Sequence, residues 1–362
     1  MKILIIYATA GAGHRRAAEA LAQEFEKTDH QVTLVDCLDY TSFLYKVSYS
    51  KGYTFLVSKI PWLWAFAFGL LDLPFMSPVM RFSRRLQNIF NTKKLENYLI
   101  EEKFDYIFST HFLTNEVAGY LKIKGKIGSH IVSIVTDFDV HRIWLAKGVD
   151  TYCVASDWTK KKLAILDIPD ENIVVTGIPT DEKFTRHDDI AALKRKLGLD
   201  DDLFTVLIAT GSFGFGPIEK IIQLLPGMQI IVVCGHNKAL YERLSKKPKD
   251  LVKVCGLVNN MDELMAVSDA MITKPGGLSI SEALVSGLPM IFFNAIPGQE
   301  TNNIKVLKEY GIGISNCPIE EMAKVLNGLR ISEEDLQEAK ENIKKLAQPD
   351  AAGNIVNLVS GG

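Results

Sequence analysis

Short apolar runs, each followed by a turn and a helix-forming stretch, occur in two separate series along this 362-residue chain. The first series runs through Lys2–Tyr7, 32–36, 106–109, 130–136 and 151–155; the second runs through 205–209, 229–234, 252–255, 270–273 and 290–293. Short strands that alternate with helices form parallel sheets with helices on both faces. The chain is therefore predicted to fold as two doubly wound α/β domains, with ligand sites at the carboxyl ends of the strands.

A polar, charged stretch at residues 179–202 separates the two series, and the length of the chain also favours two domains. We expect an N-terminal domain at 1–178, a C-terminal domain at 179–340, and a C-terminal helix within 341–362 that packs back toward the first domain.

Composition excludes some classes of protein and favours others. The net charge of −2 gives no general attraction to nucleic acid. The five cysteines form no Cys-x-x-Cys pair, which favours a reducing cytosol over a disulfide framework. Met1 and Lys2 lead directly into a strand, so we expect no signal peptide. No metal-ligand spacing is present, and no metal cofactor is expected.

Residues 41–97 differ from the rest of the chain. Of its 33 aromatic residues, 12 lie within residues 41–90, and residues 41–97 hold eight Lys or Arg against two acids. The uncharged run at 60–71 is too short for a bilayer span, which needs roughly 20 residues. Residues 79, 82, 86, 89 and 90 share one helical face, and the arginines lie toward the other.

A basic amphipathic helix beside an aromatic segment indicates a monotopic membrane anchor that binds an anionic surface. The alternatives are a buried helical insertion and a dimer interface. The residues expected at the membrane are Trp62, Trp64, Phe66, Arg81, Phe82, Arg84 and Arg85.

The turn after the first strand contains Gly11 and Gly13 and leads to His14 at the start of a helix. Glycines let the backbone approach a ligand closely, and a helix N-terminus lowers the pKa of an imidazole and favours a neutral base. The turn lacks the Gly-Lys-Ser/Thr ending of a nucleotide-binding P-loop. His14 is therefore a candidate base, with a simple helix cap as the alternative.

Two other polar residues end strands of the first series. Asp137 follows the run at 130–136, and we expect it either to orient His14 or to accept a proton itself; a turn cap is the alternative. His111 ends the run at 106–109, and the same alternatives apply to it.

The second series has four turns at successive strand ends, at 210–216, 256–261, 274–283 and 295–303. In the third, Pro275-Gly276-Gly277 precedes a helix whose N–H groups and dipole suit a phosphate. Glu282 in that helix is placed to bind a ribose, and Gln299 and Glu300 suit sugar hydroxyls. Four compatible turns in one domain predict a nucleotide-sugar site.

Three segments together resemble the monogalactosyldiacylglycerol synthases and bacterial diacylglycerol glucosyltransferases. They are Gly11–His14, Val135–Asp137 with His141 and Trp144, and Lys274–Glu282 continuing to Pro297–Glu300. The resemblance covers nearly the whole chain, and the C-terminal motif is its most specific part. Two departures are Ala12, where the plant enzymes have a glycine, and Phe112, where plant relatives usually have proline.

That resemblance implies an inverting GT-B glycosyltransferase whose two Rossmann-like domains face a central cleft, related to the peptidoglycan GlcNAc transferase. It implies that a UDP-hexose and diacylglycerol are the substrates, at the cytoplasmic face of the membrane, and that no metal is needed. The implied donor residues are Gly211, Ser212, Phe213, Leu257, Val258, Asn259, Pro275, Gly276, Gly277, Ser279, Glu282, Gln299 and Glu300. His14 and Asp137 would be catalytic, and Gly13 and His111 would lie near the acceptor.

Three rival functions remain at this stage. They are a GlcNAc transferase that acts on a polyprenyl-diphosphate lipid, a UDP-sugar 2-epimerase, and a catalytically silent membrane-docking protein. The sequence does not distinguish glucose from galactose as the transferred sugar.

Overall fold

The computed structural model describes residues 1–9, 11–73, 77–185, 187, 189–211, 214, 216–246, 250–293, 295–314 and 318–360. Side chains at 50, 51, 53, 54, 57–59, 61, 77–82 and 360 are outside the description. The chain forms two compact units. The first comprises Met1–Asp181, Ile296–Asn303 and the chain from Asp350 onward, and the second comprises Glu182–Ala295 and Ile304–Pro349.

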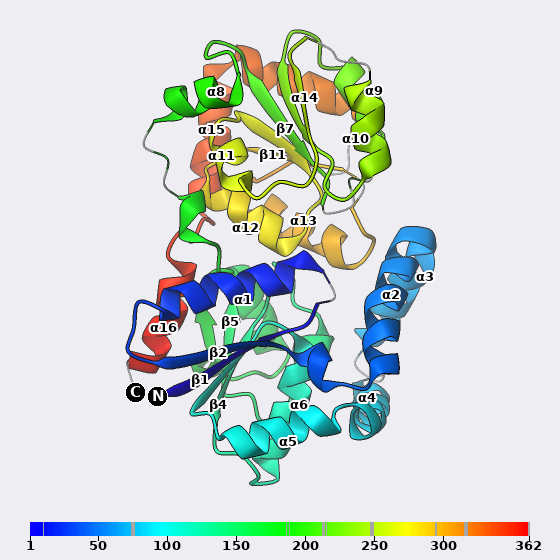
Figure 1. Cartoon of the computed structure of the whole chain (residues 1–362), viewed down its shortest axis with the longest axis vertical. Helices are drawn as coiled ribbons and strands as arrows, with labels where there is room; N and C mark the ends of the chain where they lie inside the picture. The colour runs from blue at the N-terminus through cyan, green and yellow to red at the C-terminus, as the bar shows by residue number, and fades with distance from the viewer. Residues whose placement is uncertain are drawn as a thin grey trace. The chain divides into compact units, whose positions relative to one another are not determined.

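The first unit is built on a parallel sheet with the order β2-β1-β3-β4-β5-β6 (Figure 1). Its strands are β1 (Lys2–Tyr7), β2 (Gln31–Asp36), β3 (Tyr106–Ser109), β4 (His130–Ile134), β5 (Thr151–Val154) and β6 (Ile173–Val175). Its helices are α1 (Ala12–Phe25), α2 (Phe43–Lys59), α3 (Pro61–Leu71), α4 (Ser77–Asn91), α5 (Lys93–Glu102), α6 (Phe112–Ile123), α7 (Asp157–Ile165) and α16 (Ala351–Ser360).

Successive side chains of a strand point to opposite faces of the sheet. Because these strands are apolar on both faces, helices cover both faces of the sheet. Ile3 and Ile5 of β1 pack in one core with α1 and α16, and Leu4 and Ile6 pack in the other core with α5 and α6. The helix from Ala351 thus completes the core of the first unit, although it lies at the end of the chain.

The second unit has a parallel sheet with the order β11-β10-β7-β8-β9. Its strands are β7 (Thr205–Ala209), β8 (Gln229–Val233), β9 (Val252–Cys255), β10 (Ala270–Thr273) and β11 (Met290–Phe292). Its helices are α8 (Ile190–Leu197), α9 (Ile218–Gln223), α10 (Lys238–Ser245), α11 (Met261–Ala266), α12 (Gly277–Val285), α14 (Ile319–Ile331) and α15 (Glu333–Lys344). Helix α13 (Gln299–Glu309) starts in the segment assigned to the first unit and continues into the second.

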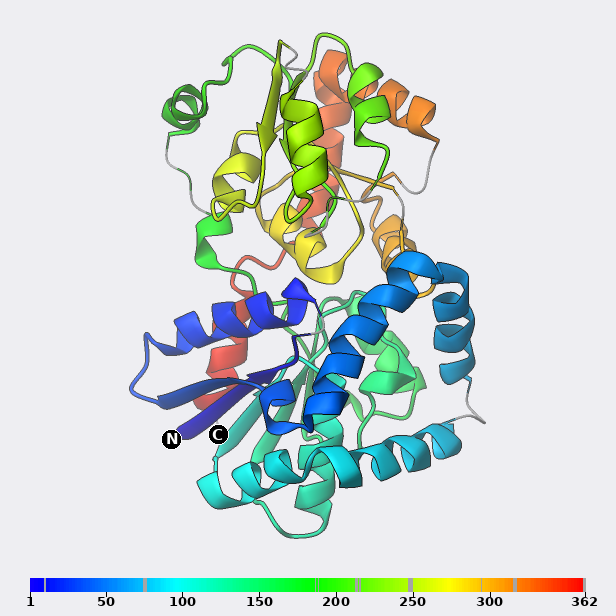
Figure 2. The ribbon, with the colours of Figure 1, turned by 45° about the vertical axis from the view of Figure 1, so that its right-hand side comes forward.

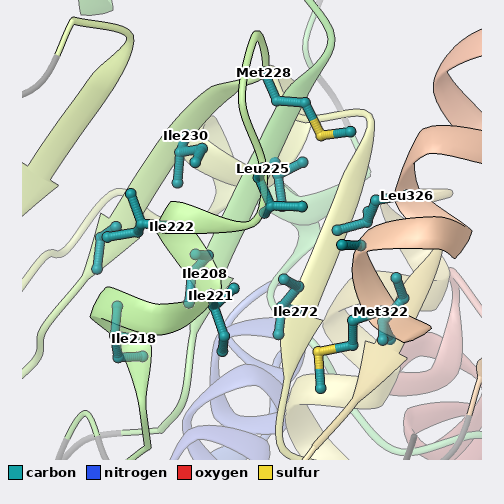
Figure 3. Close-up of a cluster of buried hydrophobic side chains, with 14 of the residues drawn as sticks. Ile208, Ile218, Ile221, Ile222, Leu225, Met228, Ile230, Ile272, Met322 and Leu326 are labelled. Carbon is teal, nitrogen blue, oxygen red and sulfur yellow. The ribbon is translucent and has the colours of Figure 1, made fainter. Parts of the chain in front are cut away.

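Aliphatic side chains fill the space between this sheet and its helices. Figure 3 shows Ile208, Ile230 and Ile272, from three neighbouring strands, meeting Ile221 of α9 and Leu326 of α14. These strands are buried on both faces, so their sequences lack the alternation of apolar and polar residues. β-Branched residues suit such strands.

Residues 41–97 form α2, α3, α4 and the start of α5. Helices α2 and α3 pack against each other, and α4 packs against α5 (Figures 1 and 2). Within the described residues, no helix is both long and apolar enough to cross a bilayer.

Candidate active site

The topology of the first sheet brings two of its turns together. In the order β2-β1-β3, the chain leaves β1 toward β2 on one side, and β3 lies on the other side. Ligands of doubly wound sheets bind at such a switch point, outside the carboxyl ends of the strands. The turn after β1 leads to His14, the third residue of α1, and the turn after β3 holds Thr110 and His111.

The imidazole of His14 is held from two neighbouring strand ends. Its Nδ1 lies 2.6 Å from the carbonyl oxygen of Thr110 and 3.0 Å from Oγ1 of Thr136. A carbonyl oxygen only accepts hydrogen bonds, so Nδ1 carries the proton and the lone pair of the neutral ring is on Nε2. Among the described residues, Nε2 has no hydrogen-bond partner.

The electrostatic setting keeps this ring neutral. Burial lowers the pKa of His14 to about 4, and the hydrogen bond to the Thr110 carbonyl opposes that shift only in part. A neutral imidazole with its lone pair on Nε2 can accept a proton from a hydroxyl group. The sequence argument gave the helix N-terminus as the cause of a lowered pKa, whereas burial is the main cause.

His111 is buried next to His14, and the two ring centroids are 5.0 Å apart in an edge-to-face arrangement. Its Nδ1 accepts the N–H of Leu113 and caps α6, so Nε2 donates to the hydroxyl of Tyr49 on α2 at 3.0 Å. Burial, and then the neighbouring His14, hold the pKa of His111 well below its usual range. His111 thus joins the 41–97 insertion to the catalytic candidate.

Asp137 follows β4 and is buried, but its carboxylate does not contact His14. Gln299 Nε2 donates to its two oxygens at 3.3 and 3.0 Å, and Asn303 Nδ2 donates at 3.2 Å. Burial raises the pKa of Asp137 to about 6, against the effect of the two amides. The expectation that Asp137 orients His14 is wrong, because Thr110 and Thr136 occupy Nδ1.

Asn303 is a polar residue that the sequence argument missed, and its side chain is 0% exposed. Its Oδ1 accepts the N–H groups of Phe138 and Asp139 at 2.9 and 3.1 Å. Glu300 in the same turn of α13 accepts the N–H of Ile296 through Oε2 at 2.6 Å, so one carboxylate oxygen caps its own helix. Asn303 lies four residues after Gln299, and that spacing, which places two residues on the same face of a helix, could have identified it from the sequence.

The insertion reaches the site at a second point, through α3. His141 Nε2 donates to the carbonyl of Phe68 at 2.9 Å, and the two rings are tilted by 36° with centroids 4.0 Å apart. Trp144 is buried nearby, with its ring centroid 6.1 Å from that of His14. A Cβ built on Gly298 would come within 2.9 Å of the Phe68 ring, so a side chain there would disturb this contact.

Helix α4 turns the side that carries Arg84 and Arg85 toward the protein. Arg84 Nη2 lies 2.8 Å from Glu116 Oε1, with each side chain 14% exposed, and Nη1 donates to the Ile143 carbonyl. Arg85 lies over the Tyr120 ring, 3.3 Å from its centre. Arg84 is therefore paired within the protein, which corrects the expectation that it binds lipid headgroups, whereas a membrane contact of Arg85 stays a prediction. Arg81 and Phe82 lie outside the described side chains.

The apolar side of α4 is consequently exposed. Phe90 is 79% exposed, and Leu86 and Ile89 are exposed as well. The Asn91 carbonyl accepts the N–H of Ser42 at 3.0 Å, which brings the end of α4 next to the exposed Phe43 and Leu44 at the start of α2. We call Phe43, Leu44, Leu86, Ile89 and Phe90 the apolar patch. Helix α3 exposes Trp62 and Phe66, and its Trp64 and Phe68 are half-buried.

The second sheet has its own switch point, between β7 and β10. Gly211 follows β7 with φ of 80°, a left-handed conformation that favours glycine. Pro275 and Gly276 follow β10, and Gly277 begins α12. A Cβ added to Gly276 would meet nothing within 4 Å. The space beside Gly276, next to the start of α12, is thus unobstructed, while Ser212 and Phe213 lie outside the description.

The remaining donor candidates lie around this point. Glu282 is buried in the second turn of α12, and Ser279 is half-buried one turn before it. Leu257 and Asn259 are exposed and Val258 is half-buried, in the turn after β9, which lies two strands from β7. At about 4.8 Å per strand, that turn is about 10 Å from the switch point. No group of three or more potential metal ligands occurs among the residues described.

Two Rossmann-like parallel sheets in one chain, each with ligand-competent turns at its switch point, define a GT-B glycosyltransferase fold. MurG from Acinetobacter baumannii has the same fold, with a TM-score of 0.62 at 16% identity over 100% of this chain and 99% of MurG. UDP-GlcNAc 2-epimerase from Neisseria meningitidis gives 0.63 at 14% identity, with both chains fully covered. These likenesses establish the fold alone.

The sequence comparisons establish the family. The model of monogalactosyldiacylglycerol (MGDG) synthase matches residues 14–180, and the glycosyltransferase family 28 C-terminal domain matches residues 205–355. The processive diacylglycerol beta-glucosyltransferase of Bacillus mycoides (strain KBAB4) is 32% identical over 382 residues, which cover 99% of this chain and 93% of that relative. The chain therefore belongs to the family of MGDG synthases and diacylglycerol glucosyltransferases.

Proposed function

We propose that this protein transfers a hexose from a UDP-sugar to the hydroxyl of diacylglycerol, with inversion, at a membrane surface. The family to which the chain belongs supports glycosyl transfer to diacylglycerol. The structural observation that carries the chemistry is the imidazole of His14, with Nδ1 bound to the Thr110 carbonyl and with no partner for Nε2 in the part of the chain that the structure describes.

In this mechanism, Nε2 of His14 accepts the proton of the lipid hydroxyl as the oxygen attacks the anomeric carbon. The bond from that carbon to the diphosphate breaks, and UDP leaves with the electron pair. General base catalysis of this kind contributes about 10²–10⁴-fold. Because the pKa of His14 is lowered to about 4, the ring is neutral and able to accept a proton near pH 7.

The leaving diphosphate carries the developing negative charge. We assign its stabilisation to the N–H groups at the start of α12 and to the turn at Gly211, since preorganised donors and a helix dipole favour an anion. Glu282 is assigned to the ribose, Leu257, Val258 and Asn259 to uracil, and Gln299 and Glu300 to the donor sugar. No metal is assigned a role.

The acceptor is a membrane lipid, so the enzyme must dock on a bilayer. The apolar patch supports this step, because α4 turns its polar side toward Glu116 and leaves its apolar side to solvent. An amphipathic helix normally buries its apolar face, and an exposed one of this kind marks an interaction surface. The exposed Lys93 and Lys94 follow α4 directly and would meet anionic headgroups. Trp62 and Phe66 of α3 would insert as well.

The experiment is to incubate the protein with radiolabelled UDP-glucose or UDP-galactose and diacylglycerol vesicles, and to identify the lipid product. A labelled monohexosyl diacylglycerol supports the proposal, and the sugar that is transferred identifies the donor. Parallel reactions with a polyprenyl-diphosphate acceptor, and with UDP-GlcNAc without acceptor, test the GlcNAc transferase and the 2-epimerase. Neither is favoured by the family of the chain. Vesicle binding without turnover of any UDP-sugar would support the silent docking protein.

A further inference from the structure

Two amide side chains on the first two turns of α13 hold one carboxylate. Gln299 and Asn303 are four residues apart, so they project from the same face of the helix. Both donate to Asp137, which follows β4. All three residues belong to the first unit, although α13 is separated from Asp137 by more than half of the second unit in sequence.

Asn303 also fixes the backbone that carries this carboxylate. Its Oδ1 accepts the N–H groups of Phe138 and Asp139, and a donor pair of this kind can only face an oxygen. The orientation of the amide is therefore determined, and Nδ2 faces Asp137 Oδ1. One fully buried side chain thus holds both the loop and the carboxylate in place.

The orientation of Gln299 is determined in turn. A carboxylate only accepts hydrogen bonds, so Nε2 of Gln299 must face Asp137, and the carbonyl oxygen of that amide faces away. The chain of contacts runs from Asn303 to Asp137 to Gln299. Gln299 lies at the first position of α13, whereas Asn303 has no exposed surface and does not itself meet a ligand.

We propose that Asn303 is a positioning residue for recognition of the donor sugar: it holds the Asp137 carboxylate, which fixes the Gln299 amide toward the hydroxyls of the hexose of a nucleotide sugar. The inference rests on the proposed function, in which Gln299 contacts that hexose. The nearby Lys162 is paired with Asp139 at 2.6 Å, and no ion pair links it to Asp137 among the described residues.

The test compares Asn303→Ala and Asn303→Asp with wild type. Asn303→Asp keeps an acceptor for the two N–H groups but replaces the donor to Asp137 with a second negative charge. Asn115→Ala is the matched control, because Asn115 is equally buried and its amide donates to Ser133 Oγ at 2.7 Å, with no contact to Asp137. A loss of activity that comes only from lower stability should appear in Asn115→Ala as well.

We expect both Asn303 variants to raise the KM for the UDP-hexose about tenfold, the factor for roughly 1.4 kcal/mol, with the diacylglycerol KM unchanged. The ratio of kcat/KM between UDP-glucose and UDP-galactose should move toward one. If the Asn303 variants instead lose kcat and stability like the control, with the donor KM and the sugar ratio unchanged, the role is only structural and the proposal is overturned.

A binding measurement separates this inference from the proposed function. Calorimetric titration with UDP-glucose and with UDP gives the contribution of the sugar as the difference, without any turnover. Asn303→Ala should reduce this difference and leave the affinity for UDP unchanged. If wild type transfers no hexose to diacylglycerol, the proposed function fails, and this difference still tests Asn303. An unchanged difference in Asn303→Ala contradicts the inference.

Discussion

The Nδ1 atom of His14 lies 2.6 Å from the carbonyl oxygen of Thr110, a residue 96 positions later in the chain. That single contact fixes the ring, directs the remaining lone pair to Nε2 and ties α1 to the end of β3. Thr110 returns a second bond, from its hydroxyl to the His14 carbonyl at 3.0 Å.

Replacing His14 with Ala or Gln should lower kcat by about 10²–10⁴-fold, because the general base is removed. UDP affinity should be nearly unchanged, since the nucleotide candidates lie in the second unit. Steady-state kinetics and calorimetry measure the two effects. His130→Gln is the control, at the opposite end of β4 from Thr136. Wild-type turnover in either His14 variant would refute the assignment of the base.

Thr136→Val should lower kcat about fivefold to tenfold, because it removes a hydroxyl 3.0 Å from His14 Nδ1 and keeps the shape of the side chain. Thr136→Ser should restore most of the activity. The comparison needs only kcat for the three proteins at pH 7. Equal loss in the Val and Ser variants would indicate that packing of the methyl group, and not the hydrogen bond, is important.

The stability of the protein should depend on pH through His14. Its pKa is about 4 in the fold and 6.5 in the unfolded chain, so the unfolded state binds a proton first as pH falls. The free energy of unfolding should therefore decrease between pH 6.5 and pH 4, by about 3 kcal/mol at most from this group. Urea unfolding of wild type and His14→Gln at several pH values measures it. The variant should lack this part of the decrease; identical pH dependence would be contrary to the prediction.

Arg84 and the apolar patch should respond to mutation in opposite ways. Arg84→Gln breaks a nearly buried ion pair and should lower the free energy of unfolding by about 2 kcal/mol, with vesicle binding unchanged. Phe43→Ser with Phe90→Ser should leave stability nearly unchanged, because both side chains are exposed, but weaken vesicle binding by about tenfold or more. Flotation with anionic vesicles and thermal unfolding measure both. Vesicle binding that depends on Arg84 and not on the phenylalanines would disprove the orientation given for α4.

Gly276→Ala should leave the fold intact and impair donor binding. A Cβ at this position meets nothing within 4 Å, and its φ of −76° suits any residue. A methyl group would, however, separate a phosphate from the start of α12, so the KM for the UDP-sugar should rise about tenfold. Gly328→Ala, in α14 and equally unobstructed, is the control. Unchanged donor KM would place the diphosphate elsewhere.

Local pattern determined much of this fold in advance. Runs such as Ile3–Ile6 are apolar on both sides, which marks strands covered by helices on both faces and hence a parallel sheet. Turns follow the strands directly, so the sequence also identified His14, Asp137 and Gly276 as strand-end residues. These residues can be recognised from the sequence, because a strand and the turn that follows it are contiguous in the chain.

The sequence by itself therefore determined the two parallel sheets, the turns at their strand ends and the family. The tertiary structure alone decided which groups meet. Helical periodicity shows that Arg84 and Phe90 occupy different sides of α4, but the position of Glu116 decides which side is buried. Likewise, Thr110 fixes the tautomer of His14, and Asn303 reaches Asp137 from 166 residues away. Periodicity is a local property, whereas a hydrogen bond or ion pair depends on a partner that only folding brings near.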